Sequence, residues 1–178
     1  MILSNLTEKT MSAAKTTDKR TFGQLDALNQ VAAFHTTFHH PILPAPHIPD
    51  AKRCQLRVNL LAEELKELEE AIANKDLVGI ADALCDLQYV LSGAVLEFGL
   101  AEKFPALFNE VQRSNMSKAC NSREEAEATV RHYAESKGEN CFIQQEGDLF
   151  LVFRQEDNKT MKSVGYSPAD LAGILNSK

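Results

Sequence analysis

The sequence predicts a mostly α protein with a four-helix-bundle-like core and a small C-terminal appendage. Between residues 22 and 116, apolar residues recur every three or four positions, which is the spacing of one helix face. Short strand-like runs occur near residues 141–154, around a glycine turn. Three regions follow from this pattern: an N-terminal tail at 1–20, a helical core at 21–120, and an accessory region at 121–178.

Each core helix has its own start or stop signal. Pro41 helps to end the first helix, and four of the six prolines in residues 41–49 favour an extended connector. Asp50 and Asp76 are suited to cap the next two helices, and Gly99 to end the third. Pro105 suits a first helical turn. The predicted core helices span residues 22–40, 50–74, 77–98 and 105–116.

The accessory region has different signals. Ser122 and Glu125 form a capping-box pattern that predicts a short charged helix to about residue 137. Two apolar runs, 141–145 and 149–154, flank Glu146-Gly147-Asp148 and predict a β-hairpin. Ser167, followed by Pro168, predicts the start of a last short helix.

Charge and cysteine usage exclude several classes of protein. The formal net charge is −6, so the chain has no overall basic field with which to neutralise nucleic-acid phosphates. The four cysteines contain no C-x-x-C pair, which indicates reduced thiols. No uninterrupted apolar run of about 18 residues is present to span a membrane. We therefore expect a cytoplasmic protein that binds neither nucleic acid nor membrane.

Carboxylates on two neighbouring helices are the candidate chemical centre. Glu64 and Glu67 share one side of the 50–74 helix, and Asp82 and Asp86 lie one turn apart on the 77–98 helix. The short link around Lys75 makes the two helices antiparallel and brings both pairs to a similar height. We interpret the four carboxylates as ligands of a hard cation, Mg²⁺ first and Mn²⁺ second.

The 77–98 helix is apolar on most of its circumference, which predicts burial nearly all round. Buried Asp82 and Asp86 would then need a compensating cation. An exposed acidic helix face is the alternative for Glu-x-x-Glu alone. His35 and His39, one turn apart, are a rival metal pair, but no third ligand stands at a zinc-like spacing.

With these residues assembled, the chain resembles the all-α NTP pyrophosphohydrolase superfamily, which includes MazG-like and phosphoribosyl-ATP pyrophosphohydrolase-like proteins. The segments that carry the resemblance are Leu61–Leu68, Asp82–Val90, Phe34-His35 with Phe38, Glu110–Lys118, and more loosely Lys159–Lys162 with Tyr166–Pro168. The family pattern in the second acidic motif is Glu-x-x-Asp. Here Ala83 occupies the glutamate position, and Asp82 beside it is the candidate substitute.

The resemblance implies Mg²⁺-dependent hydrolysis of a nucleoside triphosphate, NTP or dNTP, to a monophosphate and pyrophosphate. Glu63 or Glu67 would then be the base that takes a proton from water. Arg113 and Lys118 offer cations for phosphate oxygens, Asn115 offers hydrogen bonds, and His35 and Phe38 offer contacts to the base. The chain has no G-x-x-x-x-G-K loop, which favours direct attack by water.

Two other functions remain open on the sequence. Phosphoribosyl-ATP pyrophosphohydrolase activity shares the metal and the chemistry but not the substrate. A non-catalytic helical module would use the acidic helices for assembly. The resemblance also implies a homodimer or homotetramer.

Overall fold

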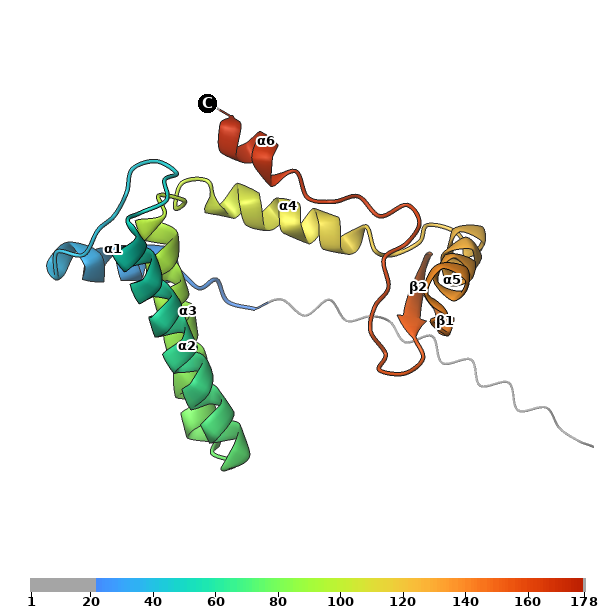
Figure 1. Cartoon of the computed structure of the whole chain (residues 1–178), viewed down its shortest axis with the longest axis horizontal. Helices are drawn as coiled ribbons and strands as arrows, with labels where there is room; N and C mark the ends of the chain where they lie inside the picture. Colours follow the sequence, from blue (N-terminus) through green and yellow to red (C-terminus); the bar gives the residue numbers. More distant parts are fainter. Residues whose placement is uncertain (1–21, 178) are drawn as a thin grey trace, which may run out of the picture.

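The computed structural model describes residues 22–177, and the predicted tail at 1–20 lies outside them. The chain is mostly helical, as predicted (Figure 1). Its elements in chain order are α1 (Ala27–Thr37), α2 (Ala51–Ala73), α3 (Leu77–Glu97), α4 (Phe104–Met116), α5 (Arg123–Lys137), β1 (Cys141–Glu146), β2 (Leu149–Arg154) and α6 (Leu171–Asn176).

Helices α2 and α3 form the predicted antiparallel hairpin, and the two N-caps are confirmed. The Asp50 carboxylate accepts a hydrogen bond from the Arg53 amide at 3.0 Å. The Asp76 carboxylate accepts from the amides of Val78 and Gly79 at 3.0 and 3.1 Å. Each cap satisfies an amide that the first helical turn leaves without a partner. Lys75 turns the chain between the helices with a positive φ of 56°.

Helix α1 packs against α3, and the proline-rich connector that follows it is fastened to the end of α3. The amide of Leu43 donates to the Leu96 carbonyl, and that of His47 to the Phe98 carbonyl, both at 3.0 Å. Gly99 ends α3 with φ 66°, and its Cα lies against the backbone of Ala45. The connector therefore returns the chain from α1 to the start of α2 across the end of α3.

The four core helices do not close into a four-helix bundle within one chain. Helix α4 leads away from the α1–α3 group and packs on α6 instead (Figure 1). One face of the hairpin is consequently uncovered. Leu65 and Leu84 are each about half exposed, and Val78 is 81% exposed. The prediction that α3 is buried nearly all round is wrong for the single chain.

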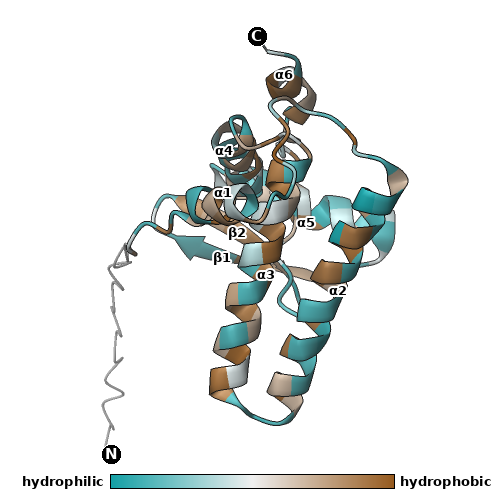
Figure 2. Ribbon diagram, turned by 90° about the vertical axis from the view of Figure 1, so that its left-hand side faces the viewer, coloured by the Kyte–Doolittle hydropathy of each residue, from teal (hydrophilic) through white to brown (hydrophobic). Residues whose placement is uncertain are grey.

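Hydrophobic turns run down both arms of the hairpin (Figure 2). Helix α3 is long and apolar enough to cross a membrane by length and composition alone, although only 28% of the apolar window is buried inside the chain. It also carries Asp82 and Asp86 in its N-terminal half, where Asp82 is exposed and Asp86 is half-buried. The uncovered apolar surface is thus concentrated on the helices that carry the acidic residues.

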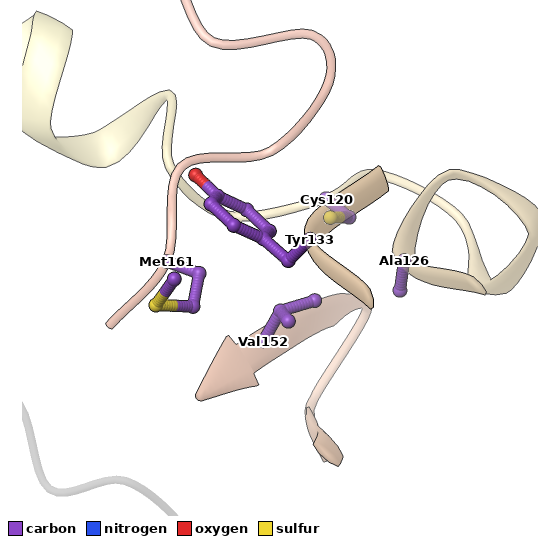
Figure 3. Close-up of a cluster of buried hydrophobic side chains, with 5 residues drawn as sticks. All are labelled: Cys120, Ala126, Tyr133, Val152 and Met161. Atoms are coloured by element: carbon purple, nitrogen blue, oxygen red, sulfur yellow. The ribbon is translucent and has the colours of Figure 1, made fainter. Parts of the chain in front are cut away.

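A second small core lies in the accessory region, where α5 packs on the predicted β-hairpin. Figure 3 shows its five buried side chains: Cys120, Ala126, Tyr133, Val152 and Met161. The outer edge of β2 is covered on both halves. The Cys120 amide donates to the Phe150 carbonyl at 2.8 Å, and the Met161 amide to the Val152 carbonyl at 2.8 Å. Covering this edge removes unpaired backbone groups that would otherwise attract another strand.

The C-terminal segment runs back along α4 and is tied to it by side chains. Lys103 Nζ donates to the carbonyls of Ile174 and Ser177 at 2.9 and 2.6 Å. Arg113 donates to the Pro168 carbonyl at 2.9 Å. The expected helix start at Ser167-Pro168 is wrong: α6 begins at Leu171, and its N-cap is Asp170. Ser167 instead donates its amide to Ser117 Oγ at 3.0 Å, in the segment beside α4.

Substitution of two glycines by alanine tests the contact between the connector and the end of α3. Gly99 and Gly138 both have a φ near +65°, but an added Cβ meets nothing at Gly138, whereas at Gly99 it overlaps the Ala45 carbonyl oxygen. We expect Gly138→Ala to lower the free energy of unfolding by about 1 kcal/mol, the cost of a left-handed residue. Gly99→Ala should cost clearly more in urea unfolding followed by far-ultraviolet circular dichroism. Equal losses for the two variants would contradict a close contact at Ala45.

Candidate functional site

A cavity of about 350 Å³ lies between α1, α2 and α3, and it contains the candidate chemistry. One side is aromatic, the floor is cationic, and the far side is acidic. All three helices and the turn after α1 contribute. Its lining comprises Val31, Phe34, His35, His40, Arg53, Leu56, Arg57, Leu60, Glu64, Asp86, Tyr89, Val90 and Gly93.

The aromatic side is built around Phe34. Its ring stacks on His40 with centroids 5.7 Å apart and an interplanar angle of 16°. Tyr89 from α3 meets it edge-on at 5.6 Å and 82°. Phe38 packs on Phe34 at 4.4 Å but does not itself line the cavity. Because Phe34 and Tyr89 are both more than one-third exposed, their free faces can receive a planar ring.

The floor is an ion-pair network centred on Glu97, which is 1% exposed. Arg53 and Arg57, one turn apart on α2, both bind its carboxylate: Arg53 Nε lies 3.2 Å from Oε2, and the Nη2 atoms of both arginines donate to Oε1. Burial alone raises the pKa of Glu97, but the hydrogen bonds from the two arginines outweigh it and the net pKa is lowered. Glu97 is therefore ionised and joins α3 to α2.

His35 extends the same network to α1. Its Nδ1 lies 2.9 Å from the Pro41 carbonyl oxygen, which can only accept, so Nδ1 carries the proton. Nε2 is then free to accept from Arg57 Nη2 at 3.3 Å. Burial lowers the pKa of His35, which keeps the ring neutral near pH 7. Gly93 permits this packing, since a Cβ there would lie 2.7 Å from Arg57 Nη1.

The acidic side brings Glu64 and Asp86 to one cavity, as predicted. Burial raises the pKa of Glu64, and the negative charges of Asp86, Glu67, Glu63 and Asp82 raise it further. These five carboxylates therefore lie within electrostatic reach of one another. Mutual repulsion of this kind is relieved when a cation binds.

The other predicted acidic residues occupy less enclosed positions. Glu63, Glu67 and Asp82 are exposed, and Asp86 is half-buried, so the predicted burial of both α3 aspartates is wrong. Ala83, at the family glutamate position, is 3% exposed, while Asp82 beside it does not line the cavity. Within residues 22–177, no three acidic, histidine or cysteine side chains form a ready-made metal cage. The metal ligands Glu64, Glu67, Asp82 and Asp86 remain a prediction.

Three predicted substrate contacts lie elsewhere in the chain. Arg113 pairs with Glu110 at 2.8 Å and holds the C-terminal segment. Lys118 donates to Asn115 at 2.9 Å, beyond the same end of α4. None of these three lines the α1–α3 cavity. The geometry does not support a zinc site at the rival pair His35 and His39. Both ring nitrogens of His35 have hydrogen-bond partners, and His39 does not line the cavity.

The cationic floor of Arg53 and Arg57 was not predicted from the sequence, because charged residues on an amphipathic helix are usually solvated. A signal was nevertheless present, because Glu97 lies in the apolar run Val95-Leu96-Glu97-Phe98 and would be buried there without compensation. A pair of arginines at an i, i+4 spacing on the neighbouring helix matches that need.

Loss of the Glu97 carboxylate tests the network. Glu97→Gln keeps the volume but leaves Arg57, 7% exposed, without its counter-charge. We expect the free energy of unfolding to fall by about 3 kcal/mol in urea titrations. The control Glu102→Gln changes an exposed residue just beyond α3 and should stay within about 0.5 kcal/mol of the unmodified chain. A Glu97→Gln variant as stable as the control would contradict a structural role for the network.

A family model described as phosphoribosyl-ATP pyrophosphohydrolase matches residues 31–115 of the chain. The matched segment starts in α1 and ends in α4, so it includes every residue that lines the cavity. No curated protein matches the chain.

Proposed function

We propose that this chain, whose residues 31–115 match the phosphoribosyl-ATP pyrophosphohydrolase family model, hydrolyses a nucleotide that carries a triphosphate chain. The bond cleaved is the one between the α and β phosphates, and the products are a monophosphate and pyrophosphate. The family match supports a pyrophosphohydrolase reaction. The choice of substrate and metal is our proposal.

One observation carries this proposal: aromatic rings and carboxylates face the same cavity. The rings of Phe34, His40 and Tyr89 suit a nucleobase. Glu64 and Asp86 lie on the acidic side, where the phosphate chain would meet a cation. A base at one side and phosphates at the other match the two chemical ends of a nucleotide.

The volume of the cavity favours the smaller of two substrates. The family match names phosphoribosyl-ATP, which carries a second ribose phosphate. At about 350 Å³ the cavity stands at the low end of the range of about 300–1,000 Å³ that is typical of small-molecule sites. We therefore favour an NTP or dNTP, with phosphoribosyl-ATP as the alternative.

The donor set fits a hard divalent cation. Glu64, Glu67, Asp82 and Asp86 would hold it through carboxylate oxygens, which suit Mg²⁺ and, second, Mn²⁺. When bound, the ion supplies positive charge to the phosphate oxygens. The pKa of Glu64, raised first by burial and then by the neighbouring carboxylates, supports this assignment because a bound cation relieves both effects.

The remaining roles in the proposed reaction fall to residues of the α2 helix and to His35. Glu63 or Glu67, exposed beside Glu64, takes the proton of the attacking water. Arg53 and Arg57 are committed to Glu97 and keep the floor rigid. His35 is neutral and fully hydrogen-bonded, so its role is to position the wall beneath Phe34.

We also propose that the chain forms a homo-oligomer through the α2–α3 hairpin. Exposed apolar patches of this kind mark protein–protein contacts. The exposed apolar side chains of these two helices are Leu65, Ile72, Leu77, Val78, Leu84 and Leu91. Helix α4 of another copy also presents exposed Phe108 and Met116. We therefore expect a homodimer or homotetramer in sedimentation velocity, and Leu84→Glu should shift it to monomer. A monomeric unmodified chain would overturn this assembly.

The products test the reaction. The chain is incubated with Mg²⁺ and each of a panel of NTPs, dNTPs and phosphoribosyl-ATP in ¹⁸O-labelled water. We expect pyrophosphate and a labelled monophosphate from at least one member. Orthophosphate release, or label only in the pyrophosphate, would place the attack elsewhere, and no turnover with any member would favour a non-catalytic helical module.

Substitution of the cavity carboxylates tests the site. Glu64→Gln and Asp86→Asn each remove a charge and little volume, so each should lower kcat by about 100-fold or more with the helical signal intact. Asp82→Asn should lower kcat less, because Asp82 lies outside the cavity.

Binding of the cation should also be visible in the stability of the chain. Millimolar Mg²⁺ should raise Tm of the unmodified chain but not of the variant that carries both Glu64→Gln and Asp86→Asn. The matched control is Glu127→Gln, an exposed glutamate on α5 that should change neither readout.

A further inference from the structure

A second cavity, of about 240 Å³, lies in the accessory region and is lined by cationic side chains. The β-sheet brings its members together from distant parts of the sequence. Both Cys120 and Met161 pair along the outer edge of β2, so the segments that contain them lie close to each other. Lys118 precedes the first of these segments, and Lys159 and Lys162 belong to the second. Lys137, from the last turn of α5, completes the set.

The four lysines are free to bind an anion. None of them has a salt-bridge partner in the part of the chain that the structure describes. Lys118 donates to the neutral amide of Asn115. Lys137 lies 5.1 Å from the ring centroid of Tyr133, and Lys162 lies 4.4 Å from that of Tyr166. Ring contacts of this kind fix an ammonium group but leave its hydrogen-bond donors available.

The fifth cation of the cavity is already neutralised. Arg154 binds Asp157 at 2.7 Å and Glu139, the one carboxylate in the lining, at 3.2 Å. Glu139 therefore cancels Arg154 rather than a lysine. Its second oxygen, Oε2, is buried and has no hydrogen-bond partner among residues 22–177.

Two tyrosines lie near these lysines, and one of them reports the positive charge. The pKa of Tyr166 is lowered, first by its hydrogen bond with Ser114 and then by the charges of Lys162, Lys118 and Arg113. Tyr133 is only 7% exposed and lines the cavity. Its hydroxyl points away from Val152 and toward the segment that follows Met161 (Figure 3). The Tyr133 hydroxyl is a further donor for an anionic oxygen in this cavity.

We propose that this cavity, defined by Lys118, Lys137, Lys159, Lys162 and Tyr133, binds a small phosphate anion of the size of pyrophosphate. Four unpaired cations suit an anion of high charge density. A volume below about 300 Å³ is too small for a whole nucleotide. Free pyrophosphate and the phosphate tail of a nucleotide share this chemistry. The choice of pyrophosphate as the probe rests on the proposed function, of which it is a product.

Titration calorimetry with inorganic pyrophosphate tests the site. The full chain carries Glu64→Gln and Asp86→Asn and no divalent metal is added, so binding is read without hydrolysis and without the proposed metal site. We expect one pyrophosphate per chain. Lys137→Gln with Lys162→Gln should weaken the Kd at least tenfold, and Tyr133→Phe, which removes only a hydroxyl, severalfold. Arg131→Gln is the matched control, since it removes an exposed cation of α5 that does not line the cavity.

The outcomes separate this site from non-specific attraction and from the catalytic proposal. No heat with pyrophosphate, or equal weakening by Arg131→Gln and the lysine variants, would overturn the anion site. A non-hydrolysable triphosphate analogue identifies the source: tighter binding than pyrophosphate, lost in the lysine variant, supports a nucleotide tail, and weaker binding supports the free anion. Pyrophosphate binding in a chain that hydrolyses none of the panel would sustain this site and refute only the proposed function.

Discussion

The carboxylate of Glu97 connects the three helices that form the cavity. It belongs to α3, binds two arginines of α2, and through Arg57 reaches His35 of α1. Burial of a carboxylate is costly, and a single counter-ion seldom repays that cost. Two guanidinium groups share the compensation here, and the neutral imidazole of His35 accepts a hydrogen bond from one of them. The spacing between Phe34 on α1, Glu64 on α2 and Asp86 on α3 depends on this junction, in which buried Arg57 of α2 contacts both Glu97 of α3 and His35 of α1.

The sequence was a good guide to local structure and a poor one to long-range packing. The N-caps at Asp50, Asp76 and Ser122 were predicted correctly because a cap depends on residues only three positions away. The burial of α3 was predicted incorrectly because burial depends on which elements cover a face. Residues between the third and fourth helices, near Gly99, direct α4 away from the hairpin, and helical periodicity contains no information about that direction.

The same contrast between local geometry and long-range packing holds for the candidate site. Glu64 and Asp86 could be placed together from the length of one turn, since hairpin geometry fixes their heights. Arg113 and Lys118 were assigned to the substrate by resemblance, but Arg113 holds the C-terminal segment and Lys118 belongs to the lysine cavity. The carboxylates of the first cavity and the four lysines of the second thus lie in different parts of the chain. The net charge of −6 contains no information about either local cluster.

The antiparallel return of the C-terminal segment along α4 has a mechanical consequence. A lone helix between two packed units behaves as a rod that bends and twists about its axis. Lys103 fastens the returning segment near one end of α4, and Ser117 fastens it near the other. A helix with a second segment bonded to both of its ends resists bending and twisting more than a helix alone. The returning segment therefore stiffens α4, the helix that lies between the aromatic cavity and the lysine cavity.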